Sequence, residues 1–350
     1  MGRFKKVSVK GWSKEKWLAY RNQNGWGGSD AADVINMPEA HGSSLSKYLE
    51  KIGEKQPFKG NGRTRSGQAM EDFIRTRHEC WDLNFPNIDV MHDNIDAGRK
   101  QRICIKDDAY LKHHKYPMFA SLDARIHKKK ILCEYKNTTK MNIRDYELGA
   151  HPTYYAQVQH NMFVTGYEAA HIFMQLDGWD YSCVVVEPDK EMQELLVETS
   201  VDLWERVTLA RQIKEEFGID SYYDHNIEYF TGIQREAVEQ LIRLEPEVTP
   251  AEDNLSFVRD MFPAQGELVT MQGDEYLRDQ VRKYVHHSDI VSEHNTYKDR
   301  HLNNALAYMG SDFNCAEFPE GKLTFRADKN GNRRPYLAPS IRKKVREGTF

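Results

Sequence analysis

The sequence predicts an α/β fold, and the residues between 118 and 176 carry that prediction. Residues 118–126 and 131–136 are rich in β-branched, aromatic and other apolar side chains, and the polar residues 127–130 between them predict a hairpin. A helix is expected over 152–164, opened by Pro-Thr and followed by a Gly. Residues 169–176 then predict a further strand. The order strand, strand, helix, strand indicates an α/β core.

Charged side chains stand opposite one another across the predicted hairpin. With a four-residue loop, Ile126 faces Ile131, and the same register places Asp123 opposite Glu134. The period of two puts Lys136 on the same face as Glu134, one pleat further on. Neighbouring carboxylates repel each other unless a cation lies between them, and an ammonium at Lys136 could reach a metal-bound water. We therefore expect a divalent-metal phosphodiesterase site here, which points to a nuclease.

The same pattern also fits a hairpin that is simply solvated. An Asp opposite a Glu with a Lys nearby occurs on exposed hairpins, and D-x(n)-E-x-K matches many unrelated chains. The flanking residues favour the metal site, because Met118, Phe119, Leu122 and the run 131–133 are apolar. Charges placed among buried side chains are costly unless they are used.

Composition limits the classes of protein that this chain can be. Of the 350 residues 39% are hydrophobic and 29% are charged, and no window offers the long apolar run of a membrane span. The first six residues lack the apolar segment of a signal peptide, so we expect a soluble, cytoplasmic protein. The five cysteines are scattered without a C-x-x-C motif, which predicts reduced structural thiols and argues against disulfides, a zinc site and an iron–sulfur cluster.

The net charge of -4 conceals a segregation of charge along the chain. Residues 1–21 carry seven Lys and Arg against Glu15 alone, residues 322–346 carry nine against Asp328 alone, and residues 187–260 are strongly acidic. Basic ends around an acidic middle suit a protein that guides a phosphate backbone along one surface. Basic tails that are merely solvated explain the pattern equally well.

A glycine-containing loop near the N-terminus is a candidate phosphate site. Residues 12–23 have helical spacing, residues 24–28 break it, and Ser29 is the predicted N-cap of a helix over 31–35. Backbone amides at this helix start, with Arg21 close by, could hold a phosphate. An ordinary helix cap has the same sequence.

Two further helices offer polar side chains. An amphipathic helix is predicted over 67–81, where Glu71 lies beside the apolar stripe and could reach inward. On the later helix, Gln157 shares one side with His160. Residues 85–97 between them are expected to be a short strand or loop.

Regular periodicity returns in five later segments, which are 187–217, 234–244, 275–309, 321–327 and 334–338. The first three predict helices, and the last two predict a basic hairpin around Asn330-Gly331. We therefore expect a core domain over residues 1–185. Residues 186–350 would form a mostly helical extension that ends in this hairpin and packs on the core.

Several motifs occur in a fixed order along the first half of the chain. They are the loop 26–32, Glu71 within 67–71, Asp123, Glu134-x-Lys136 and the run 154–160. Their order resembles that of YqaJ-like, lambda-type phage exonucleases, members of the PD-(D/E)xK nuclease superfamily. The resemblance covers about residues 12–180 and implies a restriction-endonuclease-like core with a mixed central sheet flanked by helices. The residue before Asp123 is Leu122, whereas the motif PD-(D/E)xK has Pro there, a departure that is common in the superfamily.

The resemblance implies roles for the hairpin residues. Asp123 and Glu134 would bind one or two Mg²⁺ ions, for which Mn²⁺ substitutes, and Tyr135 would lend its backbone carbonyl. Lys136 would activate or orient the attacking water. Near the metal, the ammonium pKa of Lys136 is expected to fall, so that the side chain shares a proton with that water.

The resemblance also implies roles outside the hairpin. Glu71 would complete the metal site directly or through water, and Gln157 would line it from the following helix. Arg21 and Ser29 resemble the positions that hold a terminal 5′-phosphate.

The function implied by the resemblance is that of a Mg²⁺-dependent exonuclease that degrades linear double-stranded DNA from its ends, 5′ to 3′, in phage-type recombination or DNA repair. Expected partners are duplex DNA ends, a single-strand annealing protein and further copies of the chain, of which a ring is one arrangement; no membrane is expected. Two alternatives stay open. A structure-specific or restriction-like endonuclease would share every catalytic residue. An inactive nuclease-fold DNA-binding protein is disfavoured by the intact set Asp123, Glu134 and Lys136, because a degenerate site usually loses one member.

Overall fold

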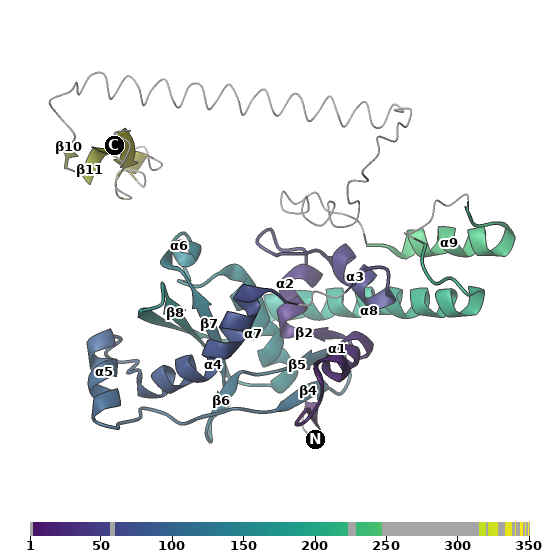
Figure 1. Ribbon diagram of the computed structural model, residues 1–350, viewed down its shortest axis with the longest axis horizontal. Helices are drawn as coiled ribbons and strands as arrows, with labels where there is room; N and C mark the ends of the chain where they lie inside the picture. Colours follow the sequence, from purple (N-terminus) through teal and green to yellow (C-terminus); the bar gives the residue numbers. More distant parts are fainter. Residues whose placement is uncertain are drawn as a thin grey trace. The chain divides into compact units, whose positions relative to one another are not determined.

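The computed structural model describes residues 3–56, 60–222 and 229–246, together with short segments between 315 and 349. The chain divides into two compact units, residues 1–264 and 265–350. The first unit contains two mixed sheets flanked by helices, and the second contains an antiparallel sheet of strands β10, β11 and β12 (Figure 1). This architecture confirms the predicted α/β class.

The described part of the first unit alternates helices and strands. Its helices are α1 (Lys14–Gln23), α2 (Ala31–Val34), α3 (Ser44–Ile52), α4 (Gly62–Cys80), α5 (Ile88–Asp96), α6 (Lys140–Ile143), α7 (Pro152–Thr165), α8 (Lys190–Phe217) and α9 (Gly232–Leu244). Its strands are β1 (Phe4–Ser8), β2 (Trp26–Gly27), β3 (Cys104–Ile105), β4 (Ala109–His113), β5 (Met118–Ala120), β6 (Ala124–Ile126), β7 (Ile131–Thr138), β8 (Ala169–Leu176) and β9 (Asp180–Val186). A short 3₁₀ turn, Gly28–Asp30, precedes α2.

Strand β7 lies at the centre of the larger sheet, whose order is β3-β6-β7-β8-β9. The pair β7–β8 is parallel and the other pairs are antiparallel. Leu132 of β7 packs in one hydrophobic cluster with Val158 of α7, whereas Cys133 and Tyr135 pack in another with Ile74 of α4. Alternate residues of a strand point to opposite faces, so α7 and α4 cover the two faces of β7 (Figure 1).

The predicted hairpin register is confirmed, but its first arm is not one strand. Ala124 pairs with Cys133 and Arg125 with Leu132, which is the register that sets Asp123 opposite Glu134. Residues 118–120 instead form β5, in a second sheet of order β1-β4-β5-β2. The apolar run is buried in both sheets, so its composition did not reveal that the chain leaves one sheet and enters the other.

The prediction of a strand or loop over 85–97 was wrong. Residues 88–96 form helix α5, because Asn87 caps its start by accepting a hydrogen bond from the backbone N–H of Asp89 at 2.7 Å. Helix α4 also begins earlier than predicted. Asn61 accepts from the backbone N–H of Thr64 at 3.1 Å and so starts the helix at residue 62.

The helix and strand predicted after the hairpin are confirmed. Helix α7 has Pro152 in its first turn, and the side chain of His151 accepts a hydrogen bond from the backbone of Thr153. It ends at Gly166, whose φ of 69° is the left-handed conformation that glycine adopts at little cost. Strand β8 covers the predicted range 169–176. These elements are specified by local signals, which is why the sequence locates them.

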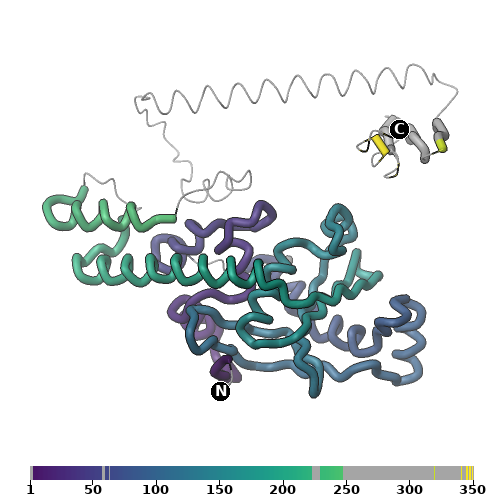
Figure 2. Tube along the Cα trace, turned by 180° about the vertical axis from the view of Figure 1, so that it is seen from behind, coloured from purple at the N-terminus to yellow at the C-terminus, as the bar shows by residue number. Residues whose placement is uncertain are grey.

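Helices α8 and α9 share a hydrophobic cluster with α3 and with Trp26 of the N-terminal loop 24–28. Helix α8 runs alongside α3 and α9 (Figure 2). Trp26 is completely buried in this cluster, where its indole N–H donates to the carbonyl of Ser200 at 2.9 Å. The helices predicted over 187–217 and 234–244 are confirmed. The helix predicted over 275–309 lies outside the described residues, and the domain boundary at 185 stays a prediction.

The second unit contains the predicted C-terminal hairpin. Strands β11 (Gly321–Ala327) and β12 (Arg333–Leu337) pair antiparallel, with Leu323 opposite Leu337. The sequence did not predict β10 (Cys315–Phe318), which pairs with the other side of β11. The hairpin therefore supplies two strands of a small three-stranded sheet.

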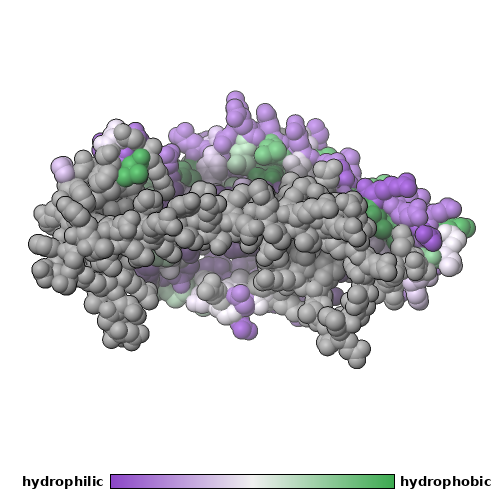
Figure 3. Space-filling view, turned by 90° about the horizontal axis from the view of Figure 1, so that it is seen from above, coloured by the Kyte–Doolittle hydropathy of each residue, from purple (hydrophilic) through white to green (hydrophobic). Residues whose placement is uncertain are grey.

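The visible surface of the described residues is mostly hydrophilic on the face in Figure 3, where apolar side chains form small separate groups. Large exposed apolar residues such as Phe85, Trp179 and Tyr229 lie in different parts of the chain. Single apolar side chains of this kind are ordinary on protein surfaces. Within the described residues, no helix combines the length and the apolar character needed to cross a membrane.

Buried histidines should make the fold sensitive to acid. His160 is fully buried on α7, and burial lowers its pKa to about 4; burial also lowers the pKa of His171 to about 4. In the unfolded chain both titrate near pH 6.5, so the unfolded state binds more protons between about pH 6.5 and 4. Stability is therefore present above this window and is lost as the pH falls through it, by up to about 3 kcal/mol for His160.

Denaturant titrations of the wild type and of His160→Gln at several pH values would measure this loss. The free energy of unfolding of the wild type should fall more steeply between pH 6.5 and 4 than that of the variant. The absolute stability of the variant is not the readout, because the substitution also removes the hydrogen bond to the carbonyl of Phe119. Equal slopes would show that His160 is not held neutral.

Candidate active site

Five of the predicted site residues lie together around β7. Glu134 and Lys136 extend from one face of the strand, Asp123 lies opposite Glu134 just before β6, and Gln157 reaches them from α7. Glu71 comes from α4 and lies close enough to interact electrostatically with Glu134. The chain therefore brings three carboxylates, one ammonium and one amide into a single group.

Asp123 is held beside Glu134 by the backbone of β7. Its Oδ2 accepts a hydrogen bond from the backbone N–H of Tyr135 at 2.8 Å. Burial raises the pKa of the Asp123 carboxyl well above its usual range, and the charge of Glu134 raises it further, against the opposing effect of Lys136. The ionised pair is thus unfavourable without an additional positive charge.

The two carboxylate oxygens of Glu134 have different surroundings. Oε1 accepts hydrogen bonds from Lys136 Nζ at 2.7 Å and from Gln157 Nε2 at 2.6 Å. Oε2 is buried and has no hydrogen-bond partner among the described residues. A buried oxygen without a partner is costly, and a bound cation would satisfy it.

Lys136 is fixed by three neighbours. Its ammonium donates to Glu134 and to Gln157 Oε1, the latter at 3.0 Å, and lies 4.9 Å from the centre of the Tyr154 ring. Burial lowers the pKa of Lys136, but Glu134 and Asp123 outweigh burial and hold the pKa above its usual value. The expected fall of this pKa is therefore not produced by the side chains present and would need a cation beside the carboxylates.

The side chain of Glu71 is more exposed than that of Glu134. Its side chain is 28% exposed, compared with 3% for Glu134, and Lys106 Nζ lies 3.8 Å from its Oε2. Burial raises the pKa of Glu71, Lys106 lowers it, and Glu134 raises it again. Glu71 therefore lies at the rim of the group and responds to its charge.

The donor set fits a hard divalent cation. Asp123, Glu134 Oε2 and Glu71 offer carboxylate oxygens, which Mg²⁺ and Mn²⁺ prefer over softer ligands. Tyr135, predicted to add its carbonyl, has its backbone N–H bound to Asp123 and its side chain on the opposite face of β7. Its role as a ligand stays a prediction.

Arg21 and Ser29 lie together, as the phosphate-site prediction requires. Arg21 Nη2 donates to Ser29 Oγ at 2.8 Å and to Asp30 Oδ2 at 3.1 Å. The prediction of Ser29 as an N-cap was wrong, because Ser29 lies inside the 3₁₀ turn. Asp30 does the capping, since its carboxylate accepts from the backbone N–H of Gly27 at 3.0 Å.

Sequence reasoning missed the buried charges that hold Arg21 in place. Burial raises the pKa of Asp30, but Arg21, Lys47 and Lys51 together hold it well below its usual range. Lys51 donates to the carbonyls of Arg21 and Gly25, each at 2.8 Å, and burial lowers its pKa to about 7. Lys47 and Lys51 are four residues apart on α3, a spacing that places both on one face of the helix. This spacing is the feature of the sequence from which the pair could have been found.

Helix α7 connects the two groups. Gln157 reaches the carboxylates, and Asn161, one turn later, packs against Gly28, where a Cβ atom would lie 2.4 Å from Asn161 Oδ1. Only glycine fits at that position without displacing Asn161. Four residues of helix span about 6 Å. The carboxylate group and the Arg21–Ser29 group are therefore neighbours along one helix.

Comparison with known proteins adds a family match and structural similarities. The chain covers 98% of LHK-Exo in complex with dAMP (18% identity, TM-score 0.44, 59% of this chain) and 99% of an alkaline exonuclease, LHK-Exo, from Laribacter hongkongensis (19%, 0.43, 58%). It covers 94% of a phage related exonuclease from Haemophilus somnus 129PT (12%, 0.37, 52%). No curated protein matches this chain. The model of the YqaJ-like viral recombinase domain matches residues 16–168, a range that holds all the predicted site residues.

Proposed function

We propose that this chain is a Mg²⁺-dependent DNA exonuclease that degrades linear double-stranded DNA from its ends. The observation that carries the proposal is the buried, unpartnered Oε2 of Glu134 beside Asp123, with Lys136 on the same strand. The match to a viral recombinase domain supports a phage-type nuclease. A role in phage-type recombination or repair is part of the proposal.

The side chains divide the work of hydrolysis. Asp123, Glu134 and Glu71 would hold the metal, and the chemistry that bound Mg²⁺ supplies is polarisation of the phosphate and of an attacking water. Lys136 would place its ammonium beside that water and share a proton with it. Gln157 bridges Glu134 and Lys136 through its amide and so fixes both. Because the side chains are preorganised, little reorientation is needed when DNA binds.

Digestion of matched substrates tests the proposal directly. An exonuclease should degrade linear duplex DNA and leave a covalently closed circle of the same sequence intact. An endonuclease, which would use the same catalytic residues, would open the circle. Binding of duplex ends in Mg²⁺ or Mn²⁺ without any cleavage would favour the inactive DNA-binding alternative.

The direction of digestion, 5′ to 3′, rests on the Arg21–Ser29 group. The guanidinium of Arg21 lies 4.8 Å from the Trp17 ring centre and is anchored by Asp30. A terminal 5′-phosphate bound by Arg21 and Ser29 would lie beside α7, about one helical turn further along it than the carboxylates. This placement would present the last diester to the metal group.

A duplex with a 5′-phosphate should be degraded about 10-fold or more faster than one with a 5′-hydroxyl, because charge-assisted hydrogen bonds contribute about 1.5–3 kcal/mol. Arg21→Ala should erase most of that difference while slow cleavage continues. Rates on the two end-labelled duplexes would measure it. Lys16→Ala, on the same helix, is the matched control and should keep the preference, and Arg21→Lys should lose most of it because the planar fork is gone.

A wild-type enzyme that is indifferent to the 5′ group would contradict the pocket. So would a preference that survives in Arg21→Ala. Because Arg21 also compensates the buried Asp30, the melting temperature of each variant should be recorded beside its rates.

Assembly with other chains is a separate part of the proposal. We expect a homo-oligomer, with a ring as one form, and a single-strand annealing protein as partner. Light scattering of the purified protein measures the oligomeric state. Co-purification with the annealing protein from the same phage genome tests that partnership.

A further inference from the structure

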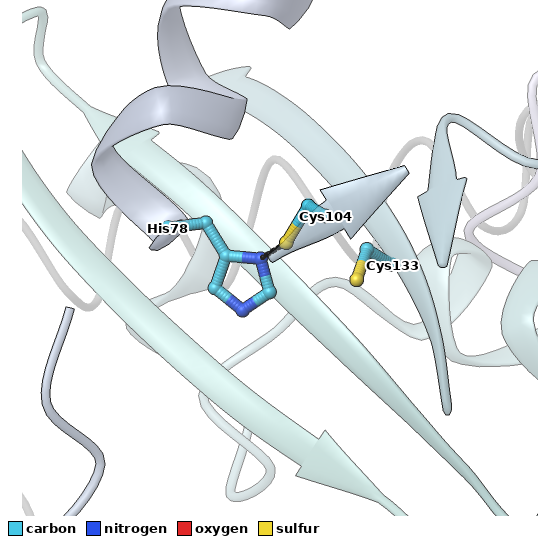
Figure 4. A group of neighbouring side chains, drawn as sticks. All are labelled: His78, Cys104 and Cys133. Atoms are coloured by element: carbon cyan, nitrogen blue, oxygen red, sulfur yellow. Dashed lines mark hydrogen bonds between the residues drawn. The ribbon is translucent and has the colours of Figure 1, made fainter. Parts of the chain in front are cut away.

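A second group of metal-ligating side chains lies behind the strand that carries Glu134 and Lys136. It consists of His78 from α4, Cys104 from β3 and Cys133 from β7, whose ligand atoms all lie within 4.8 Å of one another (Figure 4). Each of the three side chains is buried. We propose that these residues bind a structural Zn²⁺ ion.

The distance between Cys104 and His78 suits a tetrahedral metal. Zn–S bonds of about 2.3 Å and Zn–N bonds of about 2.0 Å separate neighbouring ligand atoms by roughly 3.5–3.8 Å. Cys104 Sγ lies 3.5 Å from His78 Nδ1, and Tyr135 Oη lies 3.4 Å from the same nitrogen. Cys133 Sγ lies within 4.8 Å of both other ligand atoms, so two sulfurs and one imidazole nitrogen lie close together, with the phenol oxygen of Tyr135 beside the nitrogen. Thiolates and imidazole select zinc over the magnesium expected on the other face of β7.

The second ring nitrogen of His78 supports this assignment. His78 Nε2 lies 3.0 Å from His171 Nδ1, so a proton on Nε2 can be donated to His171. Nδ1 then keeps its lone pair toward the sulfurs. Histidines that bind metals nearly always donate their other N–H to a neighbouring acceptor in this way. His171 is thus a positioning residue for the zinc ligand.

A disulfide is not an alternative use of the two cysteines. Cys104 pairs with Ile126 and Cys133 pairs with Ala124, so strand β6 lies between them. Two strand spacings amount to about 9.5 Å, whereas a disulfide needs Cα atoms within about 7 Å. A metal bridges the sulfurs without moving either strand. Binding converts both thiols to thiolates, releases two protons to solvent and changes no oxidation state.

A cavity lies beside the group. A cavity of about 280 Å³ is lined by Ile126, Ile131, Arg102 and His171, among other residues. His171 contacts His78, so the cavity reaches the edge of the proposed site. The cavity therefore ends at a residue that contacts one of the buried ligands.

The proposed zinc would stiffen the active site from behind. His78 lies two helical turns after Glu71 on α4, and Cys133 directly precedes Glu134 on β7. A metal bound to His78 and Cys133 would fix α4, which carries Glu71, to β7, which carries Glu134. It would also hold the two-residue edge strand β3, which pairs only with β6 among the described strands.

Metal analysis of the full-length protein tests the proposal. After dialysis against Zn²⁺ and removal of excess metal, the wild type should retain about one equivalent. Replacing Zn²⁺ with Co²⁺ should give a thiolate charge-transfer band in the near ultraviolet and intense tetrahedral bands in the visible region. Cys104→Ser and Cys133→Ser should each lose most of this signal. Cys80→Ser should keep it, because Cys80 is a buried cysteine that shares α4 with His78 but lies outside the group.

Two further measurements locate the metal. His171→Gln should weaken Zn²⁺ binding by about 10- to 100-fold without abolishing the thiolate band, as expected for a residue that orients a ligand. Asp123→Asn should leave Zn²⁺ binding unchanged. Loss of the metal in His171→Gln but not in Cys104→Ser would place it with His171 and Cys183 and overturn the proposal.

The wild type alone can also refute the site if the cysteine variants fail to fold. A mercurial that titrates thiols should release Zn²⁺ in step with modification, read with a zinc-sensitive dye. A folded wild type that holds less than a tenth of an equivalent, or that shows no thiolate band with Co²⁺, would overturn the proposal. So would equal loss of metal in Cys80→Ser.

Discussion

Replacing Asp123 with Asn should abolish DNA hydrolysis and at the same time stabilise the metal-free protein. Burial and the charge of Glu134 raise the pKa of the Asp123 carboxyl, so the ionised side chain destabilises the native state. The native state binds more protons than the unfolded state between the two pKa values. The destabilisation is therefore complete above the raised pKa, disappears below about pH 3.9, and is absent in the Asn variant.

The loss of activity has a different cause. A carboxylate ligand to the metal is worth several kcal/mol of transition-state stabilisation, so the rate in Mg²⁺ should fall about 10³-fold or more. Glu134→Gln should show a comparable loss. Binding of duplex ends should persist in both variants, because the proposed phosphate contacts of Arg21 and Ser29 are unchanged and one repelling charge is gone.

Asp107→Asn is the matched control for this experiment. Asp107 accepts from Arg125 at 2.9 Å and from Lys6 at 2.7 Å, and the pKa of its carboxyl is lowered, because these partners outweigh burial. Neutralising it should destabilise the fold and leave cleavage unchanged. Denaturant titrations and single-turnover digestion would separate the two patterns. Wild-type turnover by Asp123→Asn in Mg²⁺ would show that the hairpin is not the active site.

The sequence predicted the parts of the site that depend on short-range signals. The four-residue turn and the period of two were enough to place Asp123 opposite Glu134, and the opening Pro152 and closing Gly166 located α7 and therefore Gln157. Glu71 also lies where the amphipathic pattern of its helix placed it. Each of these inferences uses residues that are close together along the chain.

Long-range packing accounts for what the sequence did not predict. The exit of residues 118–120 into a second sheet depends on β4 and β2, which are their partners there. The network around Asp30 needs α3 to approach the N-terminal loop. The absence of a C-x-x-C motif argued against zinc, but the fold brings His78, Cys104 and Cys133 together from three separate elements. No spacing within one segment encodes such a group.

Lys136→Ala should slow cleavage strongly while leaving metal binding intact. The ammonium donates to Glu134 Oε1, which keeps a second hydrogen bond from Gln157, and Oε2 is not involved. A positioned proton donor or acceptor contributes about 10²–10⁴ to a rate, so the chemical step should fall by that factor. Removing a positive charge from beside two carboxylates should not weaken binding of the cation.

Calorimetric titration of the protein with Mg²⁺ in the absence of DNA, followed by single-turnover digestion, separates the two effects. Lys140→Ala is the control, because Lys140 is a more exposed lysine nearby that pairs with Asp180 at 2.6 Å and should matter for neither. Complete loss of Mg²⁺ binding in Lys136→Ala would mean that the ammonium holds the carboxylates in place. Because Lys136 stands between Glu134 and the Tyr154 ring, that structural role is the one competing explanation its contacts offer. An unchanged Mg²⁺ affinity with a slowed chemical step would assign Lys136 to the reaction itself.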